Sequence, residues 1–412
     1  MARILILAPL EPKHDVYAYL KACLIAEGCS PVLVDLSLEA ETPELNADIR
    51  RDEVLRLAGW DHPYVERMSR TDLLTALVSG GQVIVQRELS AGRIGGIIAV
   101  GGGSATSVAT DIMRCLPFGF PKVMVSSVAS GDTRPYVGIK DIVMFNAVTD
   151  VHGLNKISRR VMANAAAAVC SMAKVTLADD YQPKGIIGLS IFSVTMPCAS
   201  RARTLLEEAG YEVIGFFAGG MGGRAMESLL REGLIDGVFD LTTTELADEL
   251  VGGIMGAGPD RLEAAGERGI PQVVAPGALD MVNFGAFNTI PVQFEGRRFY
   301  RHHPHATLMR TSPEENARLG EWIARKLNQA RGPAVFLWPE RGFSRLSIEG
   351  QPFYNPLADR AFFEALSAHL SPKVPILRVD TDINDHRFAE IAVDTLLEMM
   401  EEQQGRGVIP RP

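Results

Sequence analysis

A glycine-rich turn in the first half of the sequence has the composition of an anion-binding site. The apolar run at residues 97–100 is followed by three glycines and then by hydroxyl side chains. Glycines let a backbone turn tightly and approach a ligand closely, and the N–H groups of a helix start favour an anion. The alternative is a tight strand-to-helix turn with a serine cap. We predict that a phosphate-bearing ligand is contacted by Gly101, Gly102, Gly103, Ser104 and Thr106.

A second glycine-rich turn follows the apolar run at residues 213–217. A cation in the first turn of a helix opposes the helix dipole, so Arg224 indicates that a bound phosphate or carboxylate compensates it. The alternative partner is Glu227, three residues further along the same helix. The predicted ligand-binding residues of this turn are Gly219, Gly220, Gly222, Gly223 and Arg224.

The strand predicted at residues 123–125 leads into a polar loop that could extend the first site. Open α/β sheets bind ligands at the carboxyl ends of their strands. Ser130 and Gly131 offer contacts to phosphate or ribose, Asp132 is a candidate Mg²⁺ ligand, and Arg134 could pair with a phosphate. The alternative is an ordinary loop closed by an Asp132–Arg134 ion pair.

The turn after residues 238–241 carries hydroxyl groups and a carboxylate. Thr243 and Thr244 would lie beside the second glycine-rich turn if the two strands are neighbours, and they are predicted to contact the same ligand. Together with Glu245 they also fit a helix cap and capping box, which is the structural alternative.

A further turn begins at Gly277 and contains a carboxylate and an amide. Gly277 and Asn283 are predicted to contact the ligand. If Asp280 and Asn283 lie on a helix, they share one face and suit a metal, a ribose or a reacting group. His302 and His303 are adjacent on an extended segment and point to opposite faces, which disfavours zinc. A ligand contact or a packing role is the preferred interpretation of His302.

Short apolar runs alternate with helical segments along the whole chain. This alternation predicts an α/β fold of two Rossmann-like, doubly wound subdomains with mainly parallel sheets. A polar break near residues 178–184 places the subdomains at 1–182 and 183–412, and a tail helix at about 386–401 is expected to pack back on the first. The predicted strands are residues 4–7, 32–34, 97–100, 123–125, 142–145, 186–189, 213–217, 238–241, 273–275, 335–338 and 376–379.

Composition excludes several classes of function. The 412 residues are 47% hydrophobic and carry 41 basic against 50 acidic side chains, a net charge of −9, which disfavours a nucleic-acid partner. No apolar run approaches the roughly 18 residues of a membrane span, and the N-terminus reads as a first strand rather than a signal peptide. The five cysteines are scattered without a CxxC pair, so we expect a reducing cytoplasm.

The motifs, taken in order, resemble the family that includes the N-terminal ATP-binding domain of the tomato mosaic virus resistance protein. The resemblance covers essentially the whole chain and implies two Rossmann-like subdomains, ATP binding and a homodimer. It also implies a contact from Lys13 in the first turn. It rests on Lys13 and residues 101–107, 125–132, 150–155, 157–160, 222–226, 240–245, 276–283 and 307–311.

Two segments depart from the family pattern. Members have Asp-Thr-Lys-Gly where this chain has Glu11-Pro12-Lys13-His14, and proline lacks an N–H donor, so this turn would contact a ligand differently. Members also have His-Asn-Pro where this chain has His302-His303-Pro304.

Three hypotheses of function follow. The first is an ATP-binding protein that uses Mg²⁺, with slow phosphoryl chemistry as an extension. The second is a catabolic enzyme, a lyase or hydrolase, acting on a small carboxylate or phosphorylated metabolite, with Glu245, Asp280 or His302 as acid–base groups. The third is an oligomeric scaffold.

Overall fold

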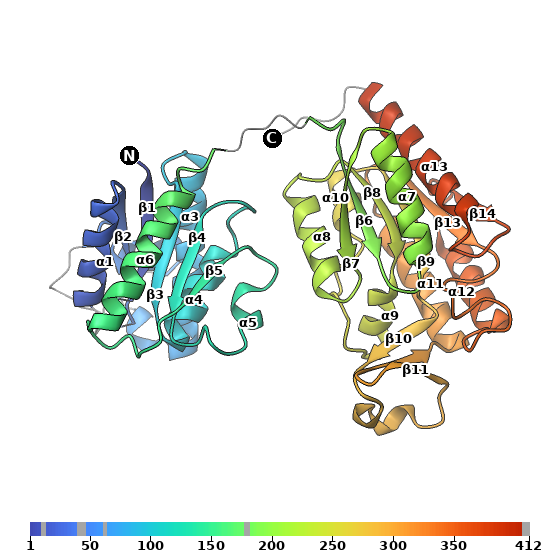
Figure 1. Cartoon of the computed structure of the whole chain (residues 1–412), viewed down its shortest axis with the longest axis horizontal. Coiled ribbons are helices and arrows are strands. Elements are labelled where there is room, and N and C mark those ends of the chain that lie inside the picture. The colour runs from blue at the N-terminus through green and yellow to red at the C-terminus, as the bar shows by residue number, and fades with distance from the viewer. Residues whose placement is uncertain (10–13, 39–46, 61–63, 177–181, 406–412) are drawn as a thin grey trace. The chain divides into compact units, whose positions relative to one another are not determined.

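The computed structural model describes residues 1–9, 14–38, 47–60, 64–176 and 182–405. The chain divides into two compact units, Met1–Asp179 and Asp180–Pro412 (Figure 1). Each unit contains a parallel sheet with helices on both faces, which confirms the predicted Rossmann-like α/β fold class. No helix in the described part of the chain is long and apolar enough to cross a membrane.

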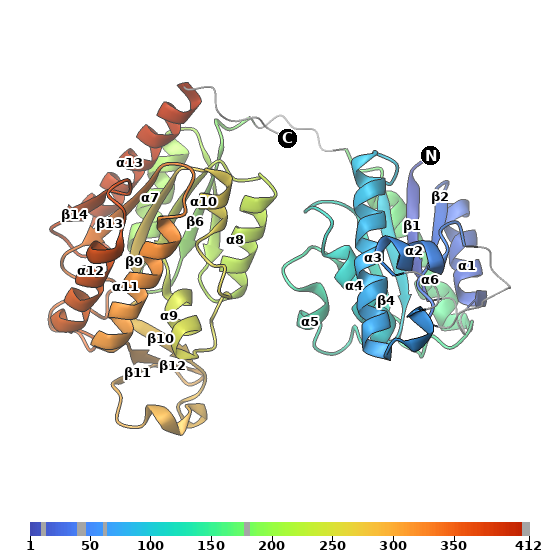
Figure 2. The ribbon, with the colours of Figure 1, turned by 180° about the vertical axis from the view of Figure 1, so that it is seen from behind.

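The first unit contains a five-stranded parallel sheet in the order β2-β1-β3-β4-β5. Alternate strand residues point to opposite faces, so Ile4 and Ile6 pack under α1 and α6, whereas Leu5 and Leu7 pack under α2, α3 and α4 (Figure 2). The elements are β1 (Arg3–Ala8), α1 (His14–Ala26), β2 (Ser30–Asp35), α2 (Arg51–Leu57), the 3₁₀ turn η1 (Tyr64–Arg67), α3 (Arg70–Ser90), β3 (Gly96–Gly101), α4 (Gly103–Met113), β4 (Lys122–Ser126), α5 (Arg134–Val137), β5 (Val143–Asn146) and α6 (Lys156–Met172).

The second unit contains a six-stranded parallel sheet in the order β14-β13-β9-β8-β6-β7 and a three-stranded antiparallel sheet in the order β10-β12-β11. Helices α7 and α13 cover one face of the large sheet, and α8 to α12 lie on the other side. The elements are β6 (Ile186–Ile191), α7 (Met196–Glu208), β7 (Glu212–Phe217), α8 (Met221–Arg231), β8 (Gly237–Thr242), α9 (Thr244–Val251), α10 (Ala264–Arg268), β9 (Gln272–Gly277), β10 (Met281–Phe284), η2 (Phe287–Thr289), η3 (Val292–Phe294), β11 (Phe299–His303), β12 (Ala306–Arg310), α11 (Pro313–Leu327), β13 (Ala334–Pro339), α12 (Pro356–His369), β14 (Ile376–Val379) and α13 (His386–Gly405).

The tail helix α13 belongs to the second unit. It packs against α7, β8 and β9, and its residues Phe388, Ala392 and Leu396 are fully buried in the same apolar cluster as Leu206 of α7. The prediction that this helix packs on the first subdomain is therefore wrong. The physical reason is that one face of the large sheet needs a second covering helix, which the chain supplies from its own end.

Each parallel sheet has one point at which the strand order reverses. In the first unit it lies between β1 and β3, and in the second between β6 and β8. The carboxyl ends of the strands at such points form a crevice where α/β proteins bind ligands. Residue Gly101 ends β3, so the first glycine-rich turn lies at this position in the first unit.

Candidate functional site

The second glycine-rich turn is closed by a carboxylate of its own chain. Glu245, at the start of α9, accepts hydrogen bonds at its Oε1 from the N–H groups of Gly220 (2.7 Å) and Gly223 (3.0 Å) at the start of α8. The Glu245 side chain has no solvent exposure. The anion predicted for this helix N-terminus is therefore Glu245, and these amides are not available to a ligand phosphate.

Packing also explains why this turn needs glycines. A Cβ atom at Gly222 would overlap the Phe217 carbonyl, and one at Gly223 would overlap the Glu245 carboxylate. Gly220 has φ +89°, a conformation that L side chains rarely adopt. The glycines of this turn therefore make room for the chain itself and not, as the sequence predicts, for a ligand.

A fully buried arginine balances Glu245. Arg261 donates from Nε to Glu245 (2.7 Å) and from Nη2 to Asp240 on β8 (2.6 Å), and its Nη1 lies 3.4 Å from Glu227 on α8. One cation thus faces three buried carboxylates, and burial raises the pKa values of Glu245 and Glu227 despite Arg261. Glu245 is part of this structural network and is not accessible for acid–base work.

Arg224 does not pair with Glu227, its alternative partner within the chain. Its Nε donates to the carbonyl of Ala257 (3.2 Å), while Glu227 accepts from Arg261 and from the N–H groups of Leu262 (2.6 Å) and Ala264 (2.8 Å). The alternative of an Arg224–Glu227 pair is therefore wrong, because the stronger competitors for Glu227 come from a loop distant in sequence, and the predicted ligand anion stays a prediction. The Arg224 side chain is exposed to solvent.

The two threonines of the neighbouring turn are buried and used within the fold. Thr243 Oγ1 donates to the carbonyl of Ala275 (3.0 Å), and Thr244 Oγ1 accepts from Asn283 Nδ2 (3.3 Å). Neither hydroxyl reaches the surface, so their predicted ligand contacts are not supported by the geometry. Gly277 is likewise required by packing, since a Cβ atom there would overlap the Leu241 carbonyl.

The prediction that Asp280 and Asn283 share one face of a helix is wrong, because neither residue lies on a helix. Asp280 lies in the turn before β10 and accepts from Ser344 Oγ (2.8 Å), and Asn283 lies on β10. Asn283 donates from its backbone N–H (3.0 Å) and its Nδ2 (2.7 Å) to Asp248, whose pKa burial raises to about 7. Both predicted residues are fully buried within the fold.

His302 lies on β11 and is half-buried. Burial, together with the charge of Arg345, lowers its pKa, so the ring is neutral near pH 7. Within the described residues, no group of three or more histidine, cysteine, aspartate or glutamate side chains is placed to hold a metal ion. Of the three predicted acid–base residues, only His302 retains access to solvent.

The first glycine-rich turn, in contrast, is open. Gly102 caps α4 with no side-chain hydrogen bond, and the first turn of the helix contains no acidic residue. A Cβ atom at Gly103 would meet nothing within 4 Å, and one at Gly102 only the Ser127 hydroxyl at 3.6 Å. Among the described residues, no acceptor pairs with the N–H groups of Gly103, Ser104 or Ala105. The alternative in which Ser104 caps the helix is therefore wrong.

Hydroxyl groups surround this open turn. Ser104 and Ser130 are exposed and Ser127 is half-buried, so all three can reach a ligand. Thr106 is fully buried, donates to the Gly102 carbonyl (2.8 Å) and pairs with Ser126 Oγ on β4 (2.7 Å). Thr106 therefore holds the turn in place, and the geometry does not support its predicted role as a ligand donor.

The loop after β4 contains the ion pair that was the structural alternative. Arg134 donates from Nε and Nη2 to the two oxygens of Asp132, each at 2.8 Å, and Arg134 is the first cause of the low Asp132 pKa of about 2. Both side chains are exposed. A magnesium role for Asp132 would require it to give up Arg134. Lys13 lies outside the described residues.

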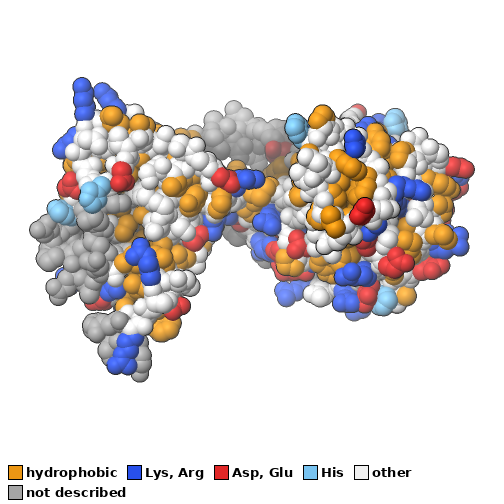
Figure 3. Space-filling view, turned by 90° about the horizontal axis from the view of Figure 1, so that it is seen from below, with side chains coloured by type: hydrophobic (Ala, Val, Ile, Leu, Met, Phe, Trp, Pro, Cys, Tyr) orange, Lys and Arg blue, Asp and Glu red, His pale blue; other side chains and the backbone are white. Residues whose placement is uncertain are grey.

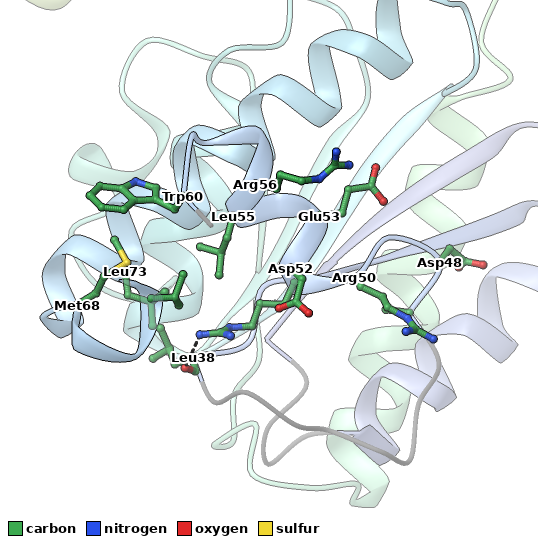
Figure 4. Close-up of a pocket in the computed structure, with 13 residues that line it drawn as sticks. Leu38, Asp48, Arg50, Asp52, Glu53, Leu55, Arg56, Trp60, Met68 and Leu73 are labelled. Carbon is green, nitrogen blue, oxygen red and sulfur yellow. Dashed lines mark hydrogen bonds between the residues drawn. The ribbon is translucent and has the colours of Figure 1, made fainter. Parts of the chain in front are cut away.

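A cavity that the sequence analysis did not identify lies beside the carboxyl end of β2. Its volume is about 810 Å³. Figure 4 shows Trp60, Met68 and Leu73 on one side and Glu53 and Arg50 on the other. Three arginines and three acidic residues line it, so it has no preferred ligand charge. No motif marks it, because its charged groups are spread along an ordinary helix and the segment before it.

The fold and the two sheet edges define a two-unit, Rossmann-like α/β protein. Residues 2–178 match the family described as Uncharacterised protein family (UPF0261) N-terminal domain, and residues 184–400 match its C-terminal domain. The chain belongs to the UPF0261 family.

Similar proteins occur in bacteria and in a plant. A UPF0261 protein of Clostridium tetani is 42% identical over 401 residues, 97% of this chain and 99% of that protein. The ToMV resistance protein Tm-1(GCR237) of Solanum lycopersicum is 41% identical over 313 residues, 74% of this chain but 42% of that protein. These matches confirm the predicted family resemblance. Among solved structures, a putative UDP-N-acetylglucosamine 2-epimerase from Listeria monocytogenes matches over 66% of this chain and 78% of the epimerase chain, at 11% sequence identity. The TM-score of this match is 0.25, which supports no argument.

The two glycine-rich turns predict opposite responses to a methyl group. Gly223→Ala should lower the free energy of unfolding by about 1–3 kcal/mol, because the new Cβ overlaps buried Glu245. The matched control Gly103→Ala, in open space on α4, should leave stability unchanged or raise it by up to about 1 kcal/mol through helix propensity. Urea denaturation of both variants measures this difference, and equal effects would contradict the contrast between the turns.

Asp248 predicts a pH dependence of stability. Its pKa is about 7 in the folded chain and about 4 when unfolded, so the folded state holds a proton that the unfolded state has released. The free energy of unfolding therefore falls as the pH rises from about 4 to about 7. Above about pH 7 the contribution of Asp248 no longer changes with pH. Asp248→Asn should remove a pH-dependent change of roughly 2–4 kcal/mol. Parallel pH profiles of unfolding for wild type and variant would refute this role.

Proposed function

We propose that the first unit binds ATP, with its phosphates at the N-terminus of α4. The observation that carries the proposal is the contrast between the two glycine-rich turns. The turn before α8 is filled by Glu245, whereas the turn before α4 has three N–H groups without an acceptor among the described residues and no side chain in the way. The open turn also follows β3 at the point where the strand order reverses.

The chemistry of the open turn suits a phosphate. The N–H groups of Gly103, Ser104 and Ala105 can donate to its oxygens, the positive end of the α4 dipole favours its charge, and the Ser127 and Ser130 hydroxyls add donors. The family resemblance implies that the phosphate belongs to ATP.

Magnesium fits this site only in part. Bound to the phosphates, Mg²⁺ would neutralise part of their charge. The carboxylate predicted as a Mg²⁺ ligand is Asp132, and Arg134 occupies both of its oxygens. We therefore propose that the phosphates hold the ion and that the chain contributes at most one carboxylate.

The alternative of an acid–base enzyme loses support from two of its three residues. Glu245 and Asp280 are fully buried and hydrogen-bonded within the fold, which leaves His302 as the accessible candidate.

All five cysteines are free, and a cytoplasmic location remains a prediction.

Replacing Gly102 with Val tests the proposed phosphate site. The backbone of Gly102 has φ −85°, which any residue adopts, so the variant should fold with little change in melting temperature. The side chain would project toward the approach of the phosphate, and affinity for Mg-ATP should fall at least ten-fold in isothermal titration calorimetry. Unchanged affinity, or wild-type stabilisation by small organic acids but not by nucleotides, would refute the proposal.

We further propose a homodimer, which the family resemblance implies and which is the commonest closed assembly of soluble proteins. Hydrophobic side chains gather on the second unit in Figure 3, and Phe287 and Val292 in the segment between β10 and β11 are 42% and 85% exposed. Light scattering at micromolar concentration should give twice the 44.7 kDa of one chain. A mass of one chain would contradict the dimer.

A further inference from the structure

A second cavity, in the second unit, opens at the carboxyl ends of β13 and β14. Its volume is about 590 Å³. Four of its lining residues lie at positions 356, 359, 360 and 363 of α12, a spacing that puts them on one face of the helix. The other walls are the ends of the two strands and the segment before α12. The cavity is lined by Trp338, Glu340, Arg341, Ile348, Glu349, Tyr354, Pro356, Asp359, Arg360, Phe363, Arg378 and Asp382.

Aromatic rings form part of the wall. Trp338 at the end of β13 packs against Phe363 of α12 with their ring centroids 4.8 Å apart, and Tyr354 is 41% exposed. The guanidinium of Arg378 already lies over the Phe363 ring, 5.2 Å from its centroid. The wall therefore combines aromatic rings with a cation–π contact made within the chain itself.

Most of the positive charge in the cavity is already paired. Arg378 Nε donates to Glu340 (2.7 Å), and Arg341 binds both oxygens of Asp380, each at 2.8 Å. Neither arginine is therefore free to attract a ligand anion without breaking an existing pair.

The carboxylates are less completely used. Arg310 holds Asp359 Oδ1 at 2.5 Å from the buried side, while Oδ2 of this cavity-lining residue has no partner among the described residues. Glu349 and Asp382 form no ion pair within the described chain. Among the cations that line the cavity, Arg360 alone forms no ion pair with the described residues, so unpaired carboxylates outnumber unpaired cations. Burial raises the pKa of Asp359 to about 6, so the carboxylate is mainly ionised near pH 7.

We propose that this cavity binds a small organic cation, an amine or guanidine with an apolar body. The body would lie against Phe363 and Tyr354, and the cationic group would face the free oxygen of Asp359 with Glu349 nearby. The site lies in the second unit, and the proposed ATP site lies in the first. Because ATP is an anion, failure of either proposal leaves the other standing.

Three ligands with the same body and different charge provide the test. Calorimetry of the full chain should show that 2-phenylethylamine binds, that 2-phenylethanol binds at least ten-fold more weakly, and that phenylacetate does not bind. Agmatine provides a guanidinium probe. Absence of binding by both cations at millimolar concentration, or tighter binding of phenylacetate, would overturn the proposal.

Variants assign the binding to the cavity. Asp359→Asn should weaken the binding of 2-phenylethylamine at least ten-fold. Glu364→Gln, at an exposed position of α12 outside the cavity lining, should leave this affinity unchanged. Asp359→Asn leaves Arg310 without its counterion, so Glu349→Gln, in an exposed segment, is the second test and should weaken binding several-fold. Amine binding that neither cavity variant alters would place it elsewhere and refute the site.

Discussion

The second unit depends on the buried ion network of Arg261. This one guanidinium joins Asp240 on β8, Glu227 on α8 and Glu245 on α9, and none of the four side chains is appreciably exposed. Removing one member of such a network leaves an uncompensated buried charge, which typically destabilises a protein by about 3–5 kcal/mol. The network also fixes Glu245 under the start of α8. This placement closes the second glycine-rich turn and leaves the first one open to a ligand.

The two units thus use one local motif in two ways. A strand, a glycine-rich turn and a helix N-terminus create a demand for negative charge in each case. In the second unit a residue of the chain meets that demand, and the glycines allow Glu245 and the Phe217 carbonyl to approach. In the first unit the first turn of α4 has no acidic residue and no side-chain cap, and a Cβ atom at Gly103 would meet nothing within 4 Å. The open turn is the one that a phosphate from outside the chain can satisfy.

Much of the fold follows from local sequence. Short apolar runs predicted all eleven strands of the two parallel sheets, and most of these strands are buried because helices cover both faces of each sheet. The short strands β10, β11 and β12 were missed, since polar residues such as Asn283 and His302 interrupt their apolar pattern. The position of α13 depends on which surface lacks a cover, and this is a property of the assembled unit.

The site was predicted less completely, for a physical reason. Glu245 lies more than twenty residues after Gly220 and Gly223, and nothing local shows that its carboxylate turns back to their amides. Thr106 has the composition of a ligand donor, but its burial against Ser126 depends on the neighbouring strand. Asp359 belongs to no motif and becomes a candidate only when β12, β13 and α12 assemble around it.

The central claim is that the open turn, and not the closed one, binds ATP. Its most direct test is a two-dimensional NMR spectrum of the full chain labelled with ¹⁵N at glycine, recorded as Mg-ATP is added. The amide signals of Gly102 and Gly103 should shift with increasing nucleotide, whereas those of Gly220 and Gly223, held by Glu245, should not. Shifts at Gly220 and Gly223 with none at Gly102 and Gly103 would contradict the claim.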